Sequence, residues 1–300
     1  MDRDRILHEI ASHIEEERVR GIPVWTDPAW NDAARRFLEG PATPSRPAAR
    51  PVPAPAPVTA SPARVPPAAP RVARPSFGPP PPAAGRMADW EALLAEAARQ
   101  ASTCRKCRLR EGCRQVVYAS GNGKVPLVFV GEAPGADEDA QGEAFVGRAG
   151  QLLTRIIAAI GLDRGDIYIC NVIKCRPPEN RNPLPDEIQA CWPYLEQQLD
   201  LLKPRVICAL GLFAAQTLLE SKAPIGKLRG RIFRYRGIPL LPTYHPAALL
   251  RNPGLKATVW EDVQLLRKIL DEGLPPAAAP EEVPEAVRAP QGPTTGDLFA

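Results

Sequence analysis

Four cysteines have the residue type and the spacing to hold a metal centre. Cys104 and Cys107 are separated by two residues, a spacing that allows one loop to supply two ligands. Cys175 and Cys191 lie far downstream and complete the set only if the chain folds back on itself. Four thiolates suit either zinc or an iron–sulfur cluster. The nearby Cys113 is an alternative ligand or a spare thiol.

A glycine-rich segment after the first cysteine pair could hold a planar ligand. Its first turn is Gly131-Glu-Ala-Pro-Gly135, its second covers residues 142–150, and acidic residues lie between them. Glycine allows backbone N–H groups to approach a ligand closely. Phe145 is flanked by small residues and is a candidate platform for stacking a nucleic-acid base, which contributes about 1–3 kcal/mol. The alternative is that Phe145 fills the hydrophobic core.

Two further polar residues follow predicted strands. Asn171 carries an amide, whose adjacent donor and acceptor match the edge of a pyrimidine, although an isolated Asn at a strand end is also a common turn residue. His245 precedes a proline and begins the segment His245-Pro-Ala-Ala-Leu-Leu-Arg251. The other two histidines, His8 and His13, belong to a separate N-terminal segment, so His245 is the histidine available to the main domain.

The elements that must position these residues alternate between strand and helix. Short apolar runs predict strands at 127–130, 167–170, 206–210 and 240–243, and amphipathic segments between them predict helices. This alternation predicts an α/β fold, with a central four-stranded parallel sheet between two layers of helices. Ligands of such sheets bind beyond the carboxyl ends of the strands, so we expect Gly131–Gly135, Asn171, Gly211 and His245 to converge at one edge.

Composition divides the 300 residues into four parts. Residues 1–40 are expected to form a small helical element, residues 41–87 a disordered linker rich in Pro, Ala and Arg, residues 88–272 the globular domain, and residues 273–300 a disordered tail. The net charge of +4 is mild. The sequence has neither a secretory signal nor an apolar run near the roughly 18 residues needed to span a membrane. We therefore expect a cytoplasmic protein with reduced thiols.

Together these motifs resemble one family, the iron–sulfur (family 4) uracil-DNA glycosylases. The resemblance covers about residues 104–270. Its first motif is similar to GEAPG-x-x-E-D-x-x-G-x-x-F-V-G-x-A-G, present at 131–150, and its second to H-P-[AS]-x-L-x-R, present at 245–251. It implies a uracil-DNA glycosylase that flips uracil out of DNA and hydrolyses its N-glycosidic bond, which initiates base excision repair. It also implies a [4Fe-4S] cluster on Cys104, Cys107, Cys175 and Cys191.

The resemblance carries roles to individual residues. The implied catalytic residues are His245, which would donate to uracil O2, Asn171, which would read the N3–H and O4 edge, and Glu138, which would line the pocket. The implied substrate-binding residues are Gly131, Glu132, Ala133, Pro134, Gly135, Phe145 and Asn171. The implied DNA contacts are Leu249 as a wedge in the duplex, with Arg251, Lys227 and Arg229 on phosphates. Ala133 occupies the position where better-known uracil glycosylases have an aspartate, so the general base remains open among Glu132, Asp137, Glu138 and Asp139.

Several readings stay open beside the glycosylase. The same fold could serve a noncatalytic DNA-binding or replication accessory protein, or a glycosylase acting on a broader range of deaminated bases. Basic residues near the cysteines suggest a surface collar that contacts phosphates: Arg105, Lys106, Arg108, Arg110, Arg114, Lys174, Arg176 and Arg181. Near the C-terminus, Thr295-Gly-Asp-Leu-Phe299 resembles the peptide that binds the bacterial sliding clamp. We expect a monomer.

Overall fold

The computed structural model describes residue 86 and residues 88–274. The expected N-terminal element at 1–40 lies outside the described residues, as do nearly all of the linker at 41–87 and of the tail at 273–300. The clamp-like peptide Thr295–Phe299 is also outside them. Within the described part, no helix has the length and apolar character required to cross a membrane.

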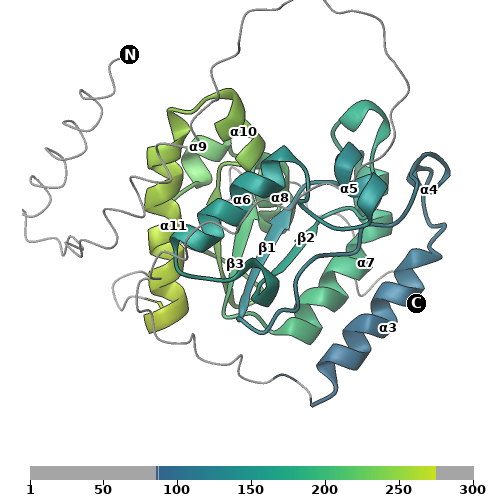
Figure 1. Cartoon of the computed structure of the whole chain (residues 1–300), viewed down its shortest axis with the longest axis horizontal. Helices are drawn as coiled ribbons and strands as arrows, with labels where there is room; N and C mark the ends of the chain where they lie inside the picture. The colour runs from purple at the N-terminus through teal and green to yellow at the C-terminus, as the bar shows by residue number, and fades with distance from the viewer. Residues whose placement is uncertain (1–85, 87, 275–300) are drawn as a thin grey trace, which may run out of the picture. The chain divides into compact units, whose positions relative to one another are not determined.

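A five-stranded sheet forms the centre of the domain, in the order β2-β1-β3-β5-β4 (Figure 1). The strands are β1 (Leu127–Gly131), β2 (Tyr168–Asn171), β3 (Val206–Leu210), β4 (Phe233–Tyr235) and β5 (Ile238–Thr243). The pairings β1–β2, β1–β3 and β3–β5 are parallel, which confirms the four predicted parallel strands. The chain reverses its direction of travel across the sheet between β1 and β3, and ligands of open α/β sheets bind at such a switch point.

The prediction of four strands was wrong by one strand. β4 pairs antiparallel with β5 at the edge of the sheet, through partners such as Phe233 and Leu240. It has only three residues, and the side chain between its two buried aromatic residues, Arg234, is exposed. A segment of this length has too few residues to show an apolar run in the sequence. Its strand conformation depends on pairing with the neighbouring β5.

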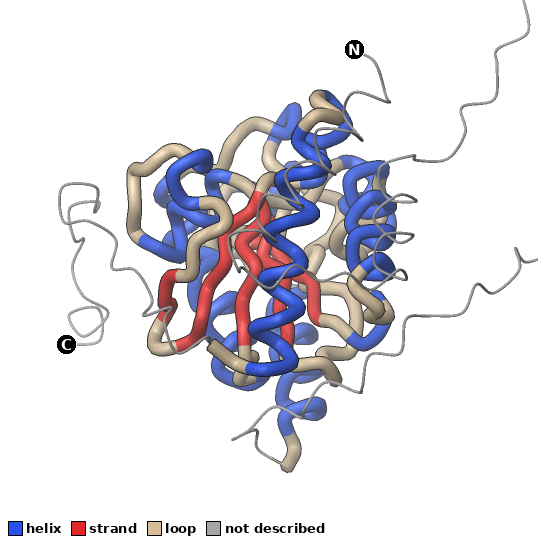
Figure 2. Tube along the Cα trace, turned by 90° about the vertical axis from the view of Figure 1, so that its left-hand side faces the viewer, coloured by secondary structure: helices blue, strands red, loops and turns tan. Residues whose placement is uncertain are grey.

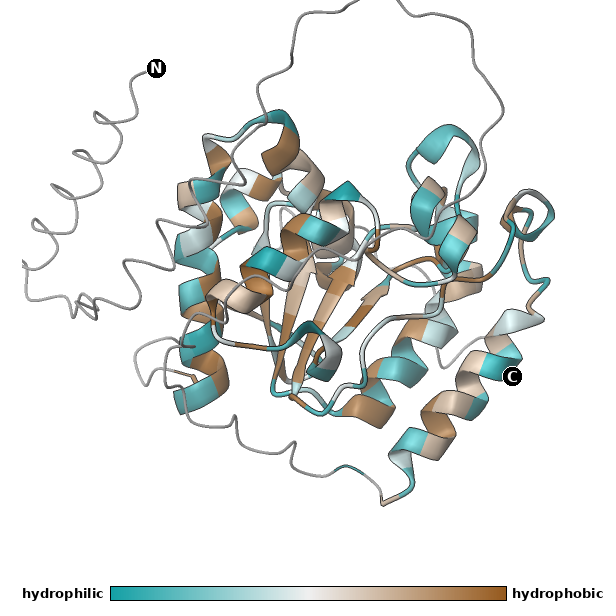
Figure 3. Ribbon diagram, viewed as in Figure 1, coloured by the Kyte–Doolittle hydropathy of each residue, from teal (hydrophilic) through white to brown (hydrophobic). Residues whose placement is uncertain are grey.

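Helices cover both faces of the sheet. Side chains from β1, β2 and β3 share one buried cluster with α7 (Pro185–Leu202) and α8 (Leu212–Leu219). On the other face α11 (Leu255–Glu272) packs against β3 and β5, and Figure 2 shows it crossing in front of the strands. The strands are strongly apolar while the helices are two-sided, as Figure 3 shows. The three-layer prediction is therefore confirmed.

The remaining helical elements connect or flank these main elements. They are α3 (Trp90–Ser102), α4 (Leu109–Gly112), α5 (Ala136–Gln141), α6 (Arg148–Ala159), η1 (Arg164–Asp166), η2 (Pro178–Asn180), α9 (Ile225–Leu228) and α10 (Pro246–Arg251). α7 and α10 each begin with proline, which is favourable in the first turn because no N–H is lost there. α10 packs against α6 and α11, so the segment after β5 is held against the segment after β1.

Candidate active site and cysteine centre

One open pocket gathers the loops that follow β1, β2, β3 and β5. Residues more than a hundred positions apart line it: Glu132, Ala133, Pro134, Gly135, Glu138, Phe145, Asn171, Gly211, Tyr244, His245 and Arg251, with part of the segment 177–182. The expected convergence at the carboxyl edge of the sheet is therefore present. Gly211 has φ of +90°, and a Cβ on it would lie 2.9 Å from the His245 Cβ, so glycine allows the loops after β3 and β5 to meet.

Phe145 is part of this pocket, but it is not exposed. Only 6% of its surface is accessible, and its ring centroid lies 5.4 Å from that of His245 at an interplanar angle of 33°. Its backbone has φ of +57°, an uncommon conformation for a bulky residue and one found at functional sites. The Arg164 guanidinium holds this loop by donating to the carbonyl oxygens of Ala144 at 2.7 Å and Phe145 at 2.8 Å.

The Glu138 carboxylate is occupied by the protein backbone. Its Oε1 accepts from the N–H groups of Val146 and Gly147, both at 3.0 Å, and its Oε2 accepts from Gly135 N at 3.1 Å. These bonds join the two glycine-rich turns and position Phe145 between them. These contacts indicate that Glu138 positions the two turns, and its expected catalytic role stays a prediction.

Asn171 ends β2 with its side chain inside the pocket. It is 1% exposed, and within the described residues its Oδ1 is buried without a hydrogen-bond partner. A Cβ on Gly131 would lie 2.4 Å from this Oδ1 and 2.5 Å from the Phe145 ring, so the space beside Gly131 is where the amide and the aromatic edge meet. A buried acceptor without a partner is costly, and a ligand N–H would satisfy it.

His245 is held in one neutral form. Its Nδ1 accepts from Ala247 N at 3.1 Å, as the cap of α10. Burial, with a smaller contribution from Arg251, lowers the pKa of His245 to about 4, so the ring is neutral at pH 7. A neutral imidazole that accepts at Nδ1 carries its proton on Nε2, so the ring offers one N–H donor to a ligand.

Glu132 is the other carboxylate that lines the pocket. It follows Gly131 at the end of β1, it is half-buried, and burial raises its pKa to about 7. The remaining candidates for a general base are placed less well. Asp139 is buried and accepts from Arg114 N at 2.9 Å, while Asp137 is exposed.

The residues expected to contact DNA have different surroundings. Arg251 and Lys227 are exposed, and Arg251 lines the pocket. Arg229 donates to both carboxylate oxygens of Asp262, including Oδ2 at 3.1 Å, and so joins its loop to α11. Its expected phosphate contact is not supported, because its guanidinium already binds carboxylates.

The expected wedge residue is also in a different place. Leu249 is 1% exposed, on the buried side of α10, whereas the next residue, Leu250, is 39% exposed. Only Leu184 accompanies Leu250 as an exposed large hydrophobic residue in the described part of the chain. Leu249 therefore packs inside the protein, and Leu250 is the apolar side chain that α10 presents to solvent.

The four cysteines predicted as ligands line a single cavity. Cys104 and Cys107 come from the segment between α3 and α4, Cys175 follows β2, and Cys191 belongs to α7. Cys113 does not line this cavity, although it lies beside Cys175. Burial raises the pKa of the Cys191 thiol to about 11, so a metal would have to displace protons from such thiols.

Within the described residues, no group of three or more Cys, His, Asp or Glu side chains is gathered closely enough to hold a metal ion. A single zinc ion requires four sulfurs about 2.3 Å from one point. The donor set and its arrangement are compatible with an iron–sulfur cluster.

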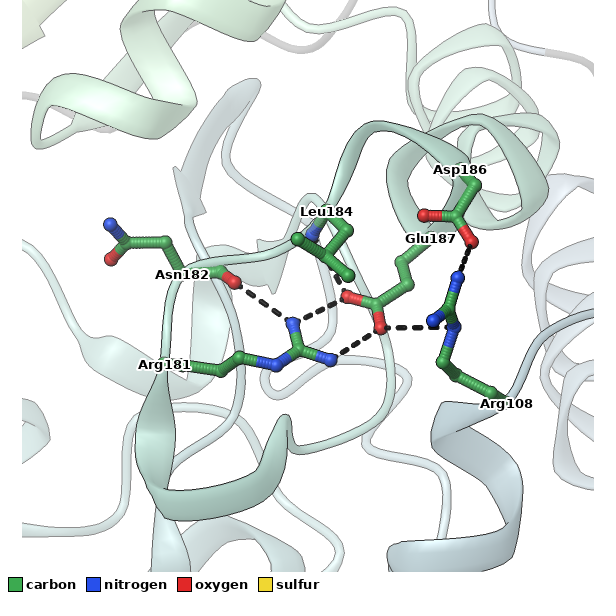
Figure 4. A network of polar contacts seen from close by, with 6 residues as sticks. All are labelled: Arg108, Arg181, Asn182, Leu184, Asp186 and Glu187. Atoms are coloured by element: carbon green, nitrogen blue, oxygen red, sulfur yellow. Dashed lines mark hydrogen bonds and ion pairs between the residues drawn. The ribbon is translucent and has the colours of Figure 1, made fainter.

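Glu187, a buried carboxylate that lines the cysteine cavity, binds Arg181, which lines the active-site pocket; Figure 4 shows the contact between the two side chains. Glu187 is 0% exposed and accepts from Arg181 at 2.8 and 2.6 Å and from Leu184 N at 2.9 Å. Arg108 lies 3.9 Å from the same carboxylate and also pairs with Asp186. The bonds from Arg181 hold the pKa of Glu187 below its usual value.

Only some residues of the predicted basic collar are therefore free at the surface to contact phosphates. Arg108 and Arg181 are engaged by carboxylates, and Lys174 is 1% exposed. Sequence reasoning missed Arg164, Glu187 and the buried position of Lys174. The one local signal was the start of α7, where Glu187 is the third helical residue and caps the Leu184 N–H.

Comparison with known proteins identifies the class that this fold and pocket define. Residues 119–266 match the uracil DNA glycosylase superfamily. The type-4 uracil-DNA glycosylase of Archaeoglobus fulgidus is 41% identical over 190 residues, which cover 61% of this chain and 96% of that protein. The Pyrobaculum aerophilum protein of the same name is 45% identical over 170 residues, covering 54% and 87%. The Thermotoga maritima protein is 41% identical over 184 residues, covering 60% and 96%. The chain belongs to the type-4 uracil-DNA glycosylase family, which confirms the resemblance seen in its motifs.

Proposed function

We propose that the pocket excises uracil from DNA through a base slot formed by Phe145, Asn171 and His245. The observation that carries the proposal is their convergence in one pocket, where the Asn171 Oδ1, buried without a partner among the described residues, meets the Phe145 ring beside Gly131, and the His245 ring lies 5.4 Å from that of Phe145. A base inside a duplex cannot reach this space, so the nucleotide must rotate out of the stack. Phe145 would stack on the flipped base, and Asn171 would accept from uracil N3–H and donate to O4.

The bond to be broken joins sugar C1′ to base N1. As it breaks, the electron pair leaves with the base, and negative charge develops on uracil O2 while the sugar approaches an oxocarbenium ion. The His245 Nε2–H is a fixed donor for that charge, and such donors stabilise a transition state more than a ground state. Because the imidazole is neutral, it stabilises the anion by a hydrogen bond without having to transfer a proton.

Water must then bond to C1′. Glu132 is a better candidate for the general base than Glu138 or Asp139, because backbone N–H groups already donate to the carboxylate oxygens of those two residues. We assign Glu132 the role of accepting the proton of the attacking water. With a pKa raised to about 7, its carboxylate fraction increases as the pH rises through neutrality, so the excision rate should rise with it.

DNA would lie along the rim that carries α10. Arg251 and Lys227 are exposed cations suited to phosphates. The exposed Leu250 would occupy the gap left by the flipped nucleotide, in place of the buried Leu249, as apolar side chains do in kinked duplexes.

The four cysteines Cys104, Cys107, Cys175 and Cys191 would hold a [4Fe-4S] cluster. The support is their donor chemistry, their shared cavity and the type-4 family of the chain. The cluster would crosslink the segment before α4, the segment after β2 and α7, which lie beside the pocket. Cytoplasmic location accords with seven free cysteines. A monomer, and sliding-clamp binding through Thr295–Phe299, remain predictions.

Base release tests this function. The full chain is incubated with single-stranded and duplex oligonucleotides that contain uracil, thymine or hypoxanthine, and abasic sites are then cleaved with alkali. We expect cleavage at uracil alone and its loss in His245→Gln. Cleavage at hypoxanthine would favour the broader glycosylase, and DNA binding without any cleavage by cluster-loaded protein would favour the noncatalytic accessory protein.

A further inference from the structure

Lys174 is a fully buried lysine that the proposed chemistry does not use. It is 1% exposed, it follows β2 by three residues, and it directly precedes Cys175. It lines the cysteine cavity, and its backbone N–H donates to Cys191 Sγ at 3.2 Å. The residue therefore touches the proposed cluster site through its backbone.

The side chain of Lys174 lies in the buried core beside β2. Its Nζ donates to the Asn171 carbonyl oxygen at 2.7 Å and to Gln198 Oε1 at 2.6 Å. Gln198, also fully buried, donates to the Tyr118 carbonyl oxygen at 3.0 Å and to the Tyr168 hydroxyl at 2.9 Å. The ammonium is thus fixed by a network that includes both ends of β2.

The charge of Lys174 has no carboxylate partner. Among residues 86 and 88–274, no Asp or Glu oxygen forms an ion pair with it, and the titratable groups that interact with its charge are the thiols of Cys170 and Cys191. The Tyr118 ring adds a weaker contact, with Nζ 5.7 Å from its centroid. A buried cation is unfavourable without a compensating negative charge, and four cluster thiolates would supply that charge.

We propose that Lys174 is a positioning residue that couples the cysteine centre to the base slot. Its positive charge balances the thiolates, and its bond to the Asn171 carbonyl sets the orientation of the Asn171 side chain, whose Oδ1 reads the base. Only the role of Lys174 in orienting Asn171 rests on the proposed function. Its role in balancing the charge of the metal centre is measured without any substrate.

Three variants of the full chain test the proposal. Lys174→Met removes both the donors and the charge with little change in length, Lys174→Gln keeps a donor but removes the charge, and Lys124→Met removes an exposed lysine as a control. For each protein, iron per chain and the midpoint potential of the centre are measured first. Single-turnover excision from uracil-containing single strands is then measured per iron-loaded molecule.

We expect both Lys174 variants to lower the midpoint potential, because reduction adds negative charge near a site that has lost a positive one. We also expect Lys174→Met to excise uracil at least tenfold more slowly per loaded molecule, with Lys174→Gln recovering part of that rate. An unchanged potential in both Lys174 variants would overturn the charge role. Excision by Lys174→Met at the rate of Lys124→Met would overturn the link to Asn171. If the wild-type protein binds iron but releases no uracil, the proposed function fails, while the potentials still decide the charge role.

Discussion

Glu138 provides a sharp test of the site, because its sequence position predicts catalysis while its contacts indicate positioning. In Glu138→Gln, one amide oxygen can still accept from Val146 and Gly147, but without a negative charge. The new NH₂ group would face the Gly135 N–H, donor against donor. Hydrogen bonds to charged groups contribute about 1.5–3 kcal/mol each. Losing one and weakening two should lower the free energy of unfolding by about 2–4 kcal/mol.

For a domain of this size, each kcal/mol corresponds to about 2–4 °C in Tm, so we expect a decrease of about 5–15 °C. The control is Glu143→Gln, which removes an exposed carboxylate from the same loop and should leave Tm nearly unchanged. Thermal unfolding followed by circular dichroism gives Tm. Single-turnover excision is then measured well below the lower Tm, where both variants are folded.

If Glu138 only positions Phe145, the excision rate should fall by about tenfold or less and keep its dependence on pH. General acid–base catalysis is typically worth 10²–10⁴-fold. A rate loss above a hundredfold with an unchanged Tm would therefore refute the positioning role and restore Glu138 as a catalytic residue.

Three further predictions follow from the same contacts. His245→Gln should lower the single-turnover rate by about 10²–10³-fold. The rate of this variant should still increase near pH 7, whereas Glu132→Gln should abolish that increase, and pH–rate profiles of the two variants check this. The folded pKa of His245 is depressed from 6.5 to about 4, so its stabilising contribution is present above pH 6.5 and is lost as the pH falls to 4; urea unfolding across this range should show wild type losing about 3 kcal/mol more than His245→Gln. Leu250→Ala should slow excision from duplex DNA but not from single strands, whereas Leu249→Ala should instead lower the free energy of unfolding by about 2–5 kcal/mol, as measured by denaturant titration.

Much of the fold could be predicted because its strands are buried on both faces. β1 and β3 each consist entirely of buried residues, so they appear in the sequence as apolar runs without polar interruption. β4 could not be predicted this way, since it is a three-residue edge strand whose pairing depends on β5. The start of α7 at Pro185 could be predicted because proline favours the first turn of a helix.

The sequence predicted which residues form the site better than it predicted how their side chains are oriented. Sequence order placed Asn171 and His245 at strand ends, and the parallel sheet brought them together. Which of Leu249 and Leu250 faces solvent depends on how α10 docks on α6, which no local pattern specifies. Arginine is a residue type that commonly binds phosphates, but Arg229 pairs with Asp262, which lies 33 residues away and comes close only when the chain folds.

The central claim is that Asn171 reads a flipped uracil within the base slot. Single-turnover release of uracil from a single-stranded oligonucleotide by Asn171→Ala, compared with wild type at equal cluster loading, tests it most directly. Two hydrogen bonds made inside a buried slot contribute about 1–2 kcal/mol each, or more as charge develops on the base, so we predict a loss of about 10²–10³-fold with DNA binding retained. A rate within fivefold of wild type would contradict the account.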